Sequence, residues 1–199
     1  MIKIGREAAP DFSCNAVIGG NIKRVTLQDF EGSYKLIFFY PLNFTFVCPT
    51  ELHALQEYYE EFKKRGVEVL AVSTDSVYSH LAWLDQPKSK GGICGITYPL
   101  LGDTSRQMVY DYGVMTEEGF ALRGTFLLDK NNVVQYAAIN NLPLGRNIAE
   151  LVRLVDALQH VEKNGEVCPA NWNQGQEAMK ATQGSLETYF LIKSLGGQR

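Results

Sequence analysis

The chain has 199 residues, of which 45% are hydrophobic and 21% are charged, and its formal net charge is −3. This length accommodates one large domain with a substantial core, and the composition argues against a disordered, repeat or membrane-inserted chain. The longest basic cluster is Lys63-Lys64-Arg65. A nucleic-acid partner is therefore not expected.

The N-terminal segment, MIKIGREAAPDFSC, contains no apolar core of signal-peptide length. No stretch approaches the roughly 18 apolar residues that span a bilayer, so we expect a cytoplasmic protein with no membrane partner. The four cysteines, Cys14, Cys48, Cys94 and Cys168, are too few for a disulfide scaffold, and none belongs to a C-x-x-C or metal-binding pattern. In a reducing compartment, cysteines at special positions are more often chemical than structural.

The first half of the chain predicts a β-α-β unit. Residues 36–40, LIFFY, are typical of a buried strand, which Pro41 ends. From about Pro49, apolar residues recur at helical spacing until Gly66, which closes the helix. Residues 67–75, VEVLAVSTD, predict a second buried strand. The two strands should therefore be parallel.

The second half adds a helix at 79–85, a Gly-rich loop at 88–95 and a helix-like segment at 104–112. Residues 121–129 and 133–139 flank a polar turn and predict a β-hairpin, which makes the sheet mixed. A long amphipathic helix is expected at 145–163. Because the sequence beyond it is polar and Gly-rich, we expect one α/β domain over residues 1–164 and a C-terminal extension over 165–199.

The stretch FYPLNFTFVCPTELHALQ, residues 39–56, raises the question of whether Cys48 packs or reacts. With Pro49 in the first helical turn, Cys48 lies at a helix N-terminus, where free N–H groups and the helix dipole stabilise a thiolate. The hydroxyl of Thr45 is short enough to hydrogen-bond the sulfur or a substrate oxygen. Taken alone, the cysteine fits a buried packing residue equally well.

The spacing P-x-x-x-T-x-x-C, formed by Pro41, Thr45 and Cys48, is more specific. With its neighbours in FYPLNFTFVCPTE it closely resembles the peroxiredoxins of the typical two-cysteine group, to which bacterial alkyl hydroperoxide reductase subunits belong. The resemblance continues through APDF, STDSVYSHLAW, ALRGTFLLD, INNLPLGR, GEVCPANW and ETYF. It implies a thioredoxin-like fold with a mixed central sheet, and a thiol peroxidase that reduces hydrogen peroxide and organic hydroperoxides to water and alcohols.

The resemblance also implies a role for each matching residue. Cys48 is the peroxidatic nucleophile, which becomes a sulfenic acid. Pro41 shields the site, Thr45 positions the peroxide, and Arg123 supports the thiolate and the developing oxyanion. Cys168 is the resolving cysteine, which forms a disulfide with Cys48 of the other subunit of a dimer. Without the resemblance, Arg123 would be a surface charge on a strand and Cys168 a surface thiol.

Glu51 and Arg146 match a charged pair that organises the peroxidatic loop in relatives. The alternative is a helix-start acid and a solvated arginine. His53 and His80 lie in helical context with no evident carboxylate partner, so neither is expected to be a general base. Cys14 and Cys94 are expected to be packing thiols, and Trp83 and Trp172 are expected to be packing or interface residues.

The Gly-rich loop departs from the Gly-Gly-Leu-Gly of relatives that are easily over-oxidised, because it reads Gly91-Gly92-Ile93-Cys94. The Tyr-Phe pair that accompanies this loop in such relatives is present as Tyr189-Phe190. Sensitivity to over-oxidation is therefore left open.

The resemblance further implies a homodimer and a decamer of five dimers. Thioredoxin or a flavoprotein disulfide reductase is the expected reductant, and the protein needs no cofactor or metal of its own. A non-enzymatic peroxide sensor or holdase chaperone is the alternative. A general disulfide oxidoreductase is disfavoured because the C-x-x-C motif is missing.

Overall fold

The structure, a computed structural model, describes residues 2–196 and divides the chain into two compact units, of which one ends at Ile148 and the next begins at Ala149. No helix within residues 2–196 is long and apolar enough to cross a membrane. The domain boundary expected at residue 164 rests on the change to a polar, Gly-rich sequence, and it stays a prediction. The two expected segments, 1–164 and 165–199, include Met1 and residues 197–199, which lie outside the described residues.

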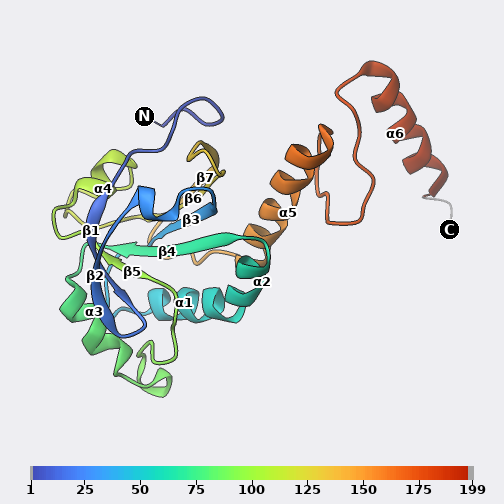
Figure 1. Cartoon of the computed structure of the whole chain (residues 1–199). Coiled ribbons are helices and arrows are strands. Elements are labelled where there is room, and N and C mark those ends of the chain that lie inside the picture. The colour runs from blue at the N-terminus through green and yellow to red at the C-terminus, as the bar shows by residue number, and fades with distance from the viewer. Residues whose placement is uncertain (1, 197–199) are drawn as a thin grey trace. The chain divides into compact units, whose positions relative to one another are not determined.

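A seven-stranded sheet forms the centre of the first unit, with strand order β2-β1-β5-β4-β3-β6-β7 (Figure 1). β3 (Tyr34–Phe39) lies parallel to β4 (Val67–Ser73), and β4 lies parallel to β5 (Leu100–Gly102). β6 (Arg123–Leu128) runs antiparallel to β3 and to β7 (Val134–Asn140). The predicted β-α-β unit, the hairpin and the mixed sheet are confirmed.

The N-terminal hairpin of β1 (Ser13–Ile18) and β2 (Asn21–Thr26) was not predicted. The first four residues of β2 are exposed, so β2 lacks the apolar alternation that marks a half-buried strand. The sequence feature that indicates this hairpin is the pair Gly19-Gly20, whose φ values of 56° and 76° suit a two-residue hairpin turn. The short helix η1 (Leu27–Phe30) follows β2.

The single helix expected between Pro49 and Gly66 is two helices, α1 (Val47–Glu57) and α2 (Tyr59–Lys64), with Tyr58 between them at φ −95° and ψ 1°. Gly66 closes α2 at φ 66°, as expected. Three more helices complete this unit: α3 (Val77–Leu84), η2 (Lys88–Lys90) and α4 (Gln107–Asp111).

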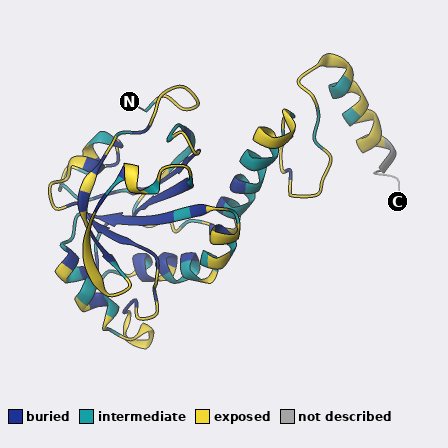
Figure 2. Cartoon of the chain, viewed as in Figure 1, coloured by how far each residue is buried: buried dark blue, intermediate teal, exposed yellow. Residues whose placement is uncertain are grey.

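Both faces of the sheet are covered. Ile37 and Phe39 of β3 belong to a core cluster that includes Tyr112, whose ring centroid lies 5.3 Å from that of Phe39. Leu36 and Phe38 alternate to the opposite face, and Figure 1 shows α1 and α3 on the other side of the sheet from α4. Every residue of β3 is buried, and Figure 2 shows the central strands in dark blue. Burial on both faces explains the continuous apolar run of β3.

The second unit contains α5 (Ile148–Asn164) from Ala149 onward, a bridge between Val167 and Met179, and α6 (Gln183–Gly196). The long helix expected at 145–163 is confirmed by α5. α6 was not predicted, because its residues Phe190 and Leu191 are each 61% exposed and form no buried apolar stripe.

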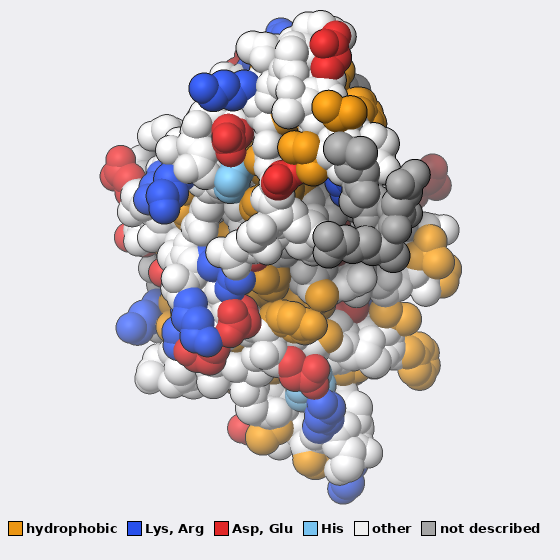
Figure 3. Space-filling view, turned by 90° about the vertical axis from the view of Figure 1, so that its right-hand side faces the viewer, with side chains coloured by type: hydrophobic (Ala, Val, Ile, Leu, Met, Phe, Trp, Pro, Cys, Tyr) orange, Lys and Arg blue, Asp and Glu red, His pale blue; other side chains and the backbone are white. Residues whose placement is uncertain are grey.

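Among the described residues on the face in Figure 3, basic and acidic side chains are interspersed, in keeping with the small net charge.

Candidate active site

The loop between β3 and α1 is held by a ring contact with α3 and by a hydrogen bond to Asp75, just after β4. Phe44 adopts a left-handed backbone conformation at φ 56°, which is costly for a residue other than glycine. Its ring packs against Trp83 with centroids 5.6 Å apart. The backbone N–H of Asn43 donates to Asp75 Oδ2 at 2.9 Å. These contacts hold the chain as it enters α1. Neither Asn43 nor Asp75 was predicted to contribute to the site.

Cys48 is the second residue of α1 and its side chain is buried. Pro49 follows it within the first turn, where a missing N–H leaves no helical hydrogen bond unmade. Cys48 lines a pocket of about 400 Å³. Pro41, Thr45 and Arg123 line the same pocket, so the structure brings the predicted residues together. The remaining lining is apolar and consists of Leu42, Phe46, Val47, Phe120, Leu142 and Pro143.

Arg123 brings a positive charge into contact with the Cys48 sulfur. It begins β6, is 4% exposed, and places Nη1 3.5 Å from Cys48 Sγ and 2.8 Å from Glu51 Oε2. Its Nε donates to the Leu142 carbonyl at 2.7 Å, which fixes the plane of the guanidinium. The alternative of a surface charge is wrong. A fixed cation beside the sulfur stabilises the thiolate that nucleophilic attack requires.

Glu51 and Arg146 form a buried pair, with side chains 2% and 5% exposed. Glu51 Oε1 accepts from the backbone N–H and the Nε of Arg146, and Oε2 accepts from its Nη2, all at 2.9 Å. Arg146 Nη1 donates to the Gly124 carbonyl at 2.8 Å, and its guanidinium lies 3.2 Å from the centroid of the Phe38 ring. Burial lowers the pKa of Arg146 from its ordinary value, and the Glu51 carboxylate opposes that shift. The solvated alternative for this pair is wrong.

The charged side chains beside Cys48 form a cluster with a net positive charge. Two buried arginines, Arg123 and Arg146, share one buried carboxylate, Glu51, which leaves one positive charge in excess. Buried charge is costly unless it is paired. Cys48 is in contact with Arg123 and so lies beside this excess of positive charge.

Thr45 does not hydrogen-bond the sulfur. Its hydroxyl donates to the Leu42 carbonyl at 2.9 Å. The hydroxyl oxygen retains acceptor capacity and belongs to the lining of the pocket. Thr45 is therefore placed to accept a hydrogen bond from a ligand in the pocket.

Neither histidine considered as a general base lines the pocket of Cys48. His80 is buried, which lowers its pKa. Its Nε2 donates to the Leu101 carbonyl at 3.2 Å, and its Nδ1 accepts from Asn43 Nδ2 at 3.0 Å. His53 Nε2 donates to the Gly92 carbonyl at 2.9 Å. Both imidazoles are hydrogen-bonded to groups outside the lining of that pocket.

Cys168 lies in the second unit and is partly buried. Its Sγ donates to the Ala157 carbonyl of α5 at 3.7 Å. Burial raises its pKa above the ordinary value, Arg153 opposes the shift and Glu166 adds to it. In this position Cys168 is a neutral thiol.

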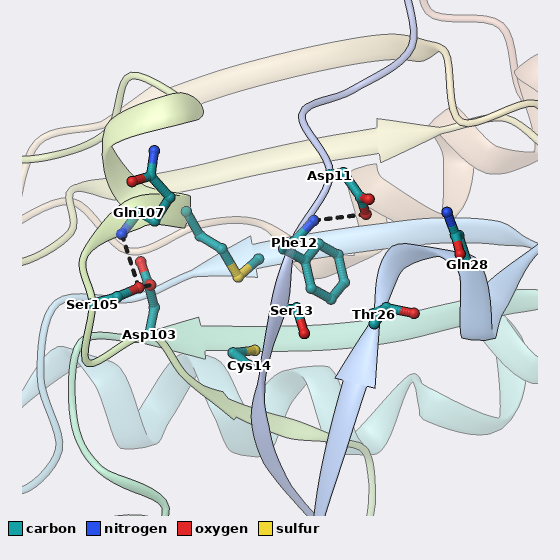
Figure 4. Close-up of a pocket in the computed structure, with 10 residues that line it drawn as sticks. Asp11, Phe12, Ser13, Cys14, Thr26, Gln28, Asp103, Ser105 and Gln107 are labelled. Atoms are coloured by element: carbon teal, nitrogen blue, oxygen red, sulfur yellow. Dashed lines mark hydrogen bonds between the residues drawn. The ribbon is translucent and has the colours of Figure 1, made fainter.

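Cys14 lines a different pocket, of about 310 Å³, shown in Figure 4. Burial, assisted by the charge of Asp103, raises the pKa of Cys14 to about 12. Both oxygens of Asp103 are engaged, Oδ1 by the Ser105 hydroxyl at 3.0 Å and Oδ2 by the Val109 N–H at 2.9 Å. Cys14 therefore stays a neutral packing thiol. Cys94 is exposed in the Gly-rich loop, so the packing role expected for it is wrong, and it does not line the pocket of Cys48.

The comparisons with known proteins agree with this geometry. Residues 5–137 match the AhpC/TSA family, and residues 157–190 match the C-terminal domain of 1-Cys peroxiredoxin. The chain is 45% identical over 191 residues to the thioredoxin peroxidase of Echinococcus granulosus, covering 96% of this chain and 99% of the relative. It is 49% identical over 183 residues to the peroxiredoxin prdx-2 of Caenorhabditis elegans, covering 92% and 91%.

Among solved structures, the reduced 2-Cys peroxiredoxin of Plasmodium vivax matches with a TM-score of 0.92 at 43% identity, covering 94% of this chain and 98% of that chain. A thioredoxin-like fold with a buried cysteine beside an arginine defines an enzyme that works through a thiol. The chain belongs to the AhpC/TSA family and is a two-cysteine peroxiredoxin, a thiol peroxidase. The thioredoxin-like fold is confirmed, and the non-enzymatic alternative is not favoured.

Proposed function

We propose that Cys48 reduces hydrogen peroxide and organic hydroperoxides and that Cys168 completes the cycle. The observation that carries the proposal is the contact of Arg123 Nη1 with Cys48 Sγ, at 3.5 Å, within a buried cluster that has one positive charge in excess. The relatives named thioredoxin peroxidase and peroxiredoxin support the substrate class.

In the first step the Cys48 thiolate attacks one oxygen of the hydroperoxide. A sulfur–oxygen bond forms while the oxygen–oxygen bond breaks, and the leaving oxygen takes up a proton to give an alcohol or water. Cys48 is left as a sulfenic acid. Arg123 stabilises the charge that develops on the separating oxygens, and Thr45 orients the peroxide by accepting from its O–H. Pro41 and the apolar lining keep bulk water from the reacting atoms.

In the second step the Cys168 thiol attacks the sulfenic acid. A Cys48–Cys168 disulfide forms, and the hydroxyl of the sulfenic acid leaves with the thiol proton as water. We propose that the two sulfurs come from different subunits of a homodimer. An external dithiol then returns both cysteines to thiols. Thioredoxin is the first candidate, because a relative is named thioredoxin peroxidase. A flavoprotein disulfide reductase is the second candidate.

Exposed aromatic side chains support further assembly. Phe44 and Tyr78 are 54% and 73% exposed in the first unit, and large exposed apolar groups often mark subunit contacts. A Plasmodium yoelii relative modified at its N-terminus forms an artifactual octamer. We propose a decamer of five dimers for this chain, and the cytoplasm as a location that keeps the thiols reduced. Sedimentation of the reduced protein measures the assembly directly.

Three cysteine variants test the chemistry. Cys48→Ser should abolish peroxide consumption, and retained turnover would contradict the assignment. Cys168→Ser should consume one equivalent of peroxide per subunit and then stop. On a non-reducing gel the oxidised wild type should run as a crosslinked dimer and Cys168→Ser as a monomer. Cys94→Ser is the matched control and should behave as wild type in both assays.

The reductant is tested by coupling peroxide turnover to each candidate in turn. Rapid multiple turnover with thioredoxin or with a flavoprotein disulfide reductase identifies the reductant. Oxidation of one equivalent followed by transfer to a client protein, with neither reductant supporting turnover, would favour the sensor.

A further inference from the structure

His160 joins helix α5 to the segment that carries Cys168. Its Nε2 donates to Glu166 Oε2 at 2.8 Å, and its Nδ1 accepts from Asn164 Nδ2 at 3.0 Å. Its ring lies against the indole of Trp172, with centroids 4.8 Å apart. The Glu166 carboxylate can only accept, so the ring nitrogen Nε2 carries a proton, and the hydrogen bonds on both nitrogens fix the orientation of the ring.

The two groups that His160 holds lie on either side of the resolving cysteine. Glu166 precedes Cys168 in the sequence, and Trp172 follows it. Arg153 of α5 also holds Trp172, because its Nη1 donates to the Trp172 carbonyl at 2.8 Å. Trp172 Nε1 donates to the Gln176 carbonyl at 3.0 Å, which closes the loop behind the indole. The segment is thus fastened to α5 both before and after Cys168.

The fastened segment holds the partly buried thiol against α5. Cys168 Sγ donates to the Ala157 carbonyl, and Ala157 lies one helical turn before His160 on the same helix. The same surroundings raise the pKa of Cys168, chiefly through burial, so the nucleophilic thiolate is disfavoured while the segment is docked. Reaction with a sulfenic acid requires the sulfur to leave this position.

We propose that His160 is a positioning residue that latches the Cys168 segment onto α5 and so limits the rate of disulfide formation. The proposal rests on the proposed function of Cys168 as the resolving cysteine. The step it controls is attack of the Cys168 sulfur on the Cys48 sulfenic acid, in which the disulfide bond forms and one water leaves with the thiol proton. A slow latch lengthens the life of the sulfenic acid, which a second peroxide can oxidise to sulfinic acid.

His160→Ala removes the hydrogen bond to Glu166 and the contact with Trp172. The combined loss should open the latch about tenfold more often, so disulfide formation should accelerate about tenfold. His160→Phe keeps a ring against Trp172 and loses only the donor, so it should give a smaller acceleration of about threefold. Formation of the sulfenic acid at Cys48 should be unchanged in both variants, because His160 belongs to the second unit and does not line the pocket of Cys48.

The test uses the reduced full-length protein, mixed with one equivalent of hydrogen peroxide and quenched at successive times. Mass spectrometry of the quenched samples gives the rate of sulfenic acid formation and the rate of disulfide formation separately. Lys163→Ala, an exposed change on the same helix, is the matched control. A general loss of folding would not accelerate the second rate while leaving the first one alone, and the partial effect of His160→Phe separates the ring contact from the hydrogen bond.

Faster disulfide formation in His160→Ala, intermediate in His160→Phe and unchanged in Lys163→Ala, supports the latch. Unchanged or slower disulfide formation in both His160 variants, with a normal wild-type disulfide, overturns the latch and leaves the proposed function intact. A wild type that forms no Cys48–Cys168 disulfide overturns both.

Discussion

Glu51→Gln tests whether the buried carboxylate organises the active site. The substitution keeps the shape of the side chain and removes its charge. Four N–H donors converge on the carboxylate at 2.8–2.9 Å, three from Arg146 and one from Arg123. The amide of glutamine accepts through one oxygen only, and its NH₂ group must face an arginine donor. Two buried guanidinium groups are then left without a counter-charge.

Removing one partner of a buried, hydrogen-bonded ion pair costs about 3–5 kcal/mol. We expect the free energy of unfolding of Glu51→Gln to fall by that amount, measured by urea unfolding of the reduced protein with an unchanged m value. Arg123 Nη1 contacts both Glu51 and Cys48, so its displacement should also slow sulfenic acid formation about 100-fold. Stopped-flow mixing with peroxide measures that rate.

Glu57→Gln on the same helix is the control. Glu57 is 69% exposed and lies 3.8 Å from Lys88, an exposed pair worth less than about 1 kcal/mol. The reasoning is refuted if Glu51→Gln and Glu57→Gln unfold at the same urea concentration and react with peroxide at the wild-type rate.

Other substitutions probe the surroundings of the site. Gly124→Ala would place a Cβ 2.6 Å from Val114 Cγ1, so the free energy of unfolding should fall by about 1–3 kcal/mol; an unchanged urea midpoint would contradict this packing. Burial lowers the pKa of His80 from its ordinary value of 6.5, so the unfolded state binds more protons and stability should fall as the pH drops below about 6.5. His80→Gln should flatten that dependence in urea titrations between pH 7 and about 5; an equally steep dependence would exclude His80 as its source. Thr45→Val should slow sulfenic acid formation about 100-fold while Thr45→Ser restores it, and equal stopped-flow rates for both would argue against peroxide positioning.

The central strand and the region around Cys48 were predictable because their signals are local. β3 is buried along its whole length, so its composition alone marks it as a strand. Pro41, Thr45 and Cys48 lie within one short loop and the first turn of one helix, and their spacing carries the resemblance. The break at Tyr58 escaped prediction, because apolar residues keep the same spacing across it.

The roles of Arg123 and Arg146 depend on contacts between distant parts of the chain. Arg123 reaches the sulfur because β6 pairs antiparallel with β3, which brings residues 75 positions apart into contact. Periodicity cannot reveal such a pairing, and only the family resemblance indicated these residues. The β1–β2 hairpin was missed because β2 is an exposed edge strand with no apolar face to recognise. His160 was missed because Glu166, its carboxylate partner, belongs to the segment beyond the helix.

The central claim is that Cys48, held beside Arg123, is the cysteine that peroxide oxidises. It is tested most directly in the Cys168→Ser variant, where the sulfenic acid cannot be resolved. The reduced variant is treated with one equivalent of hydrogen peroxide and a sulfenic-acid trapping reagent, and its peptides are analysed by mass spectrometry. We expect one adduct per subunit, on Cys48, formed about 100–1,000-fold more slowly when Arg123 is replaced by Met. An adduct on Cys14 or Cys94, or an unchanged rate in Arg123→Met, would contradict the account.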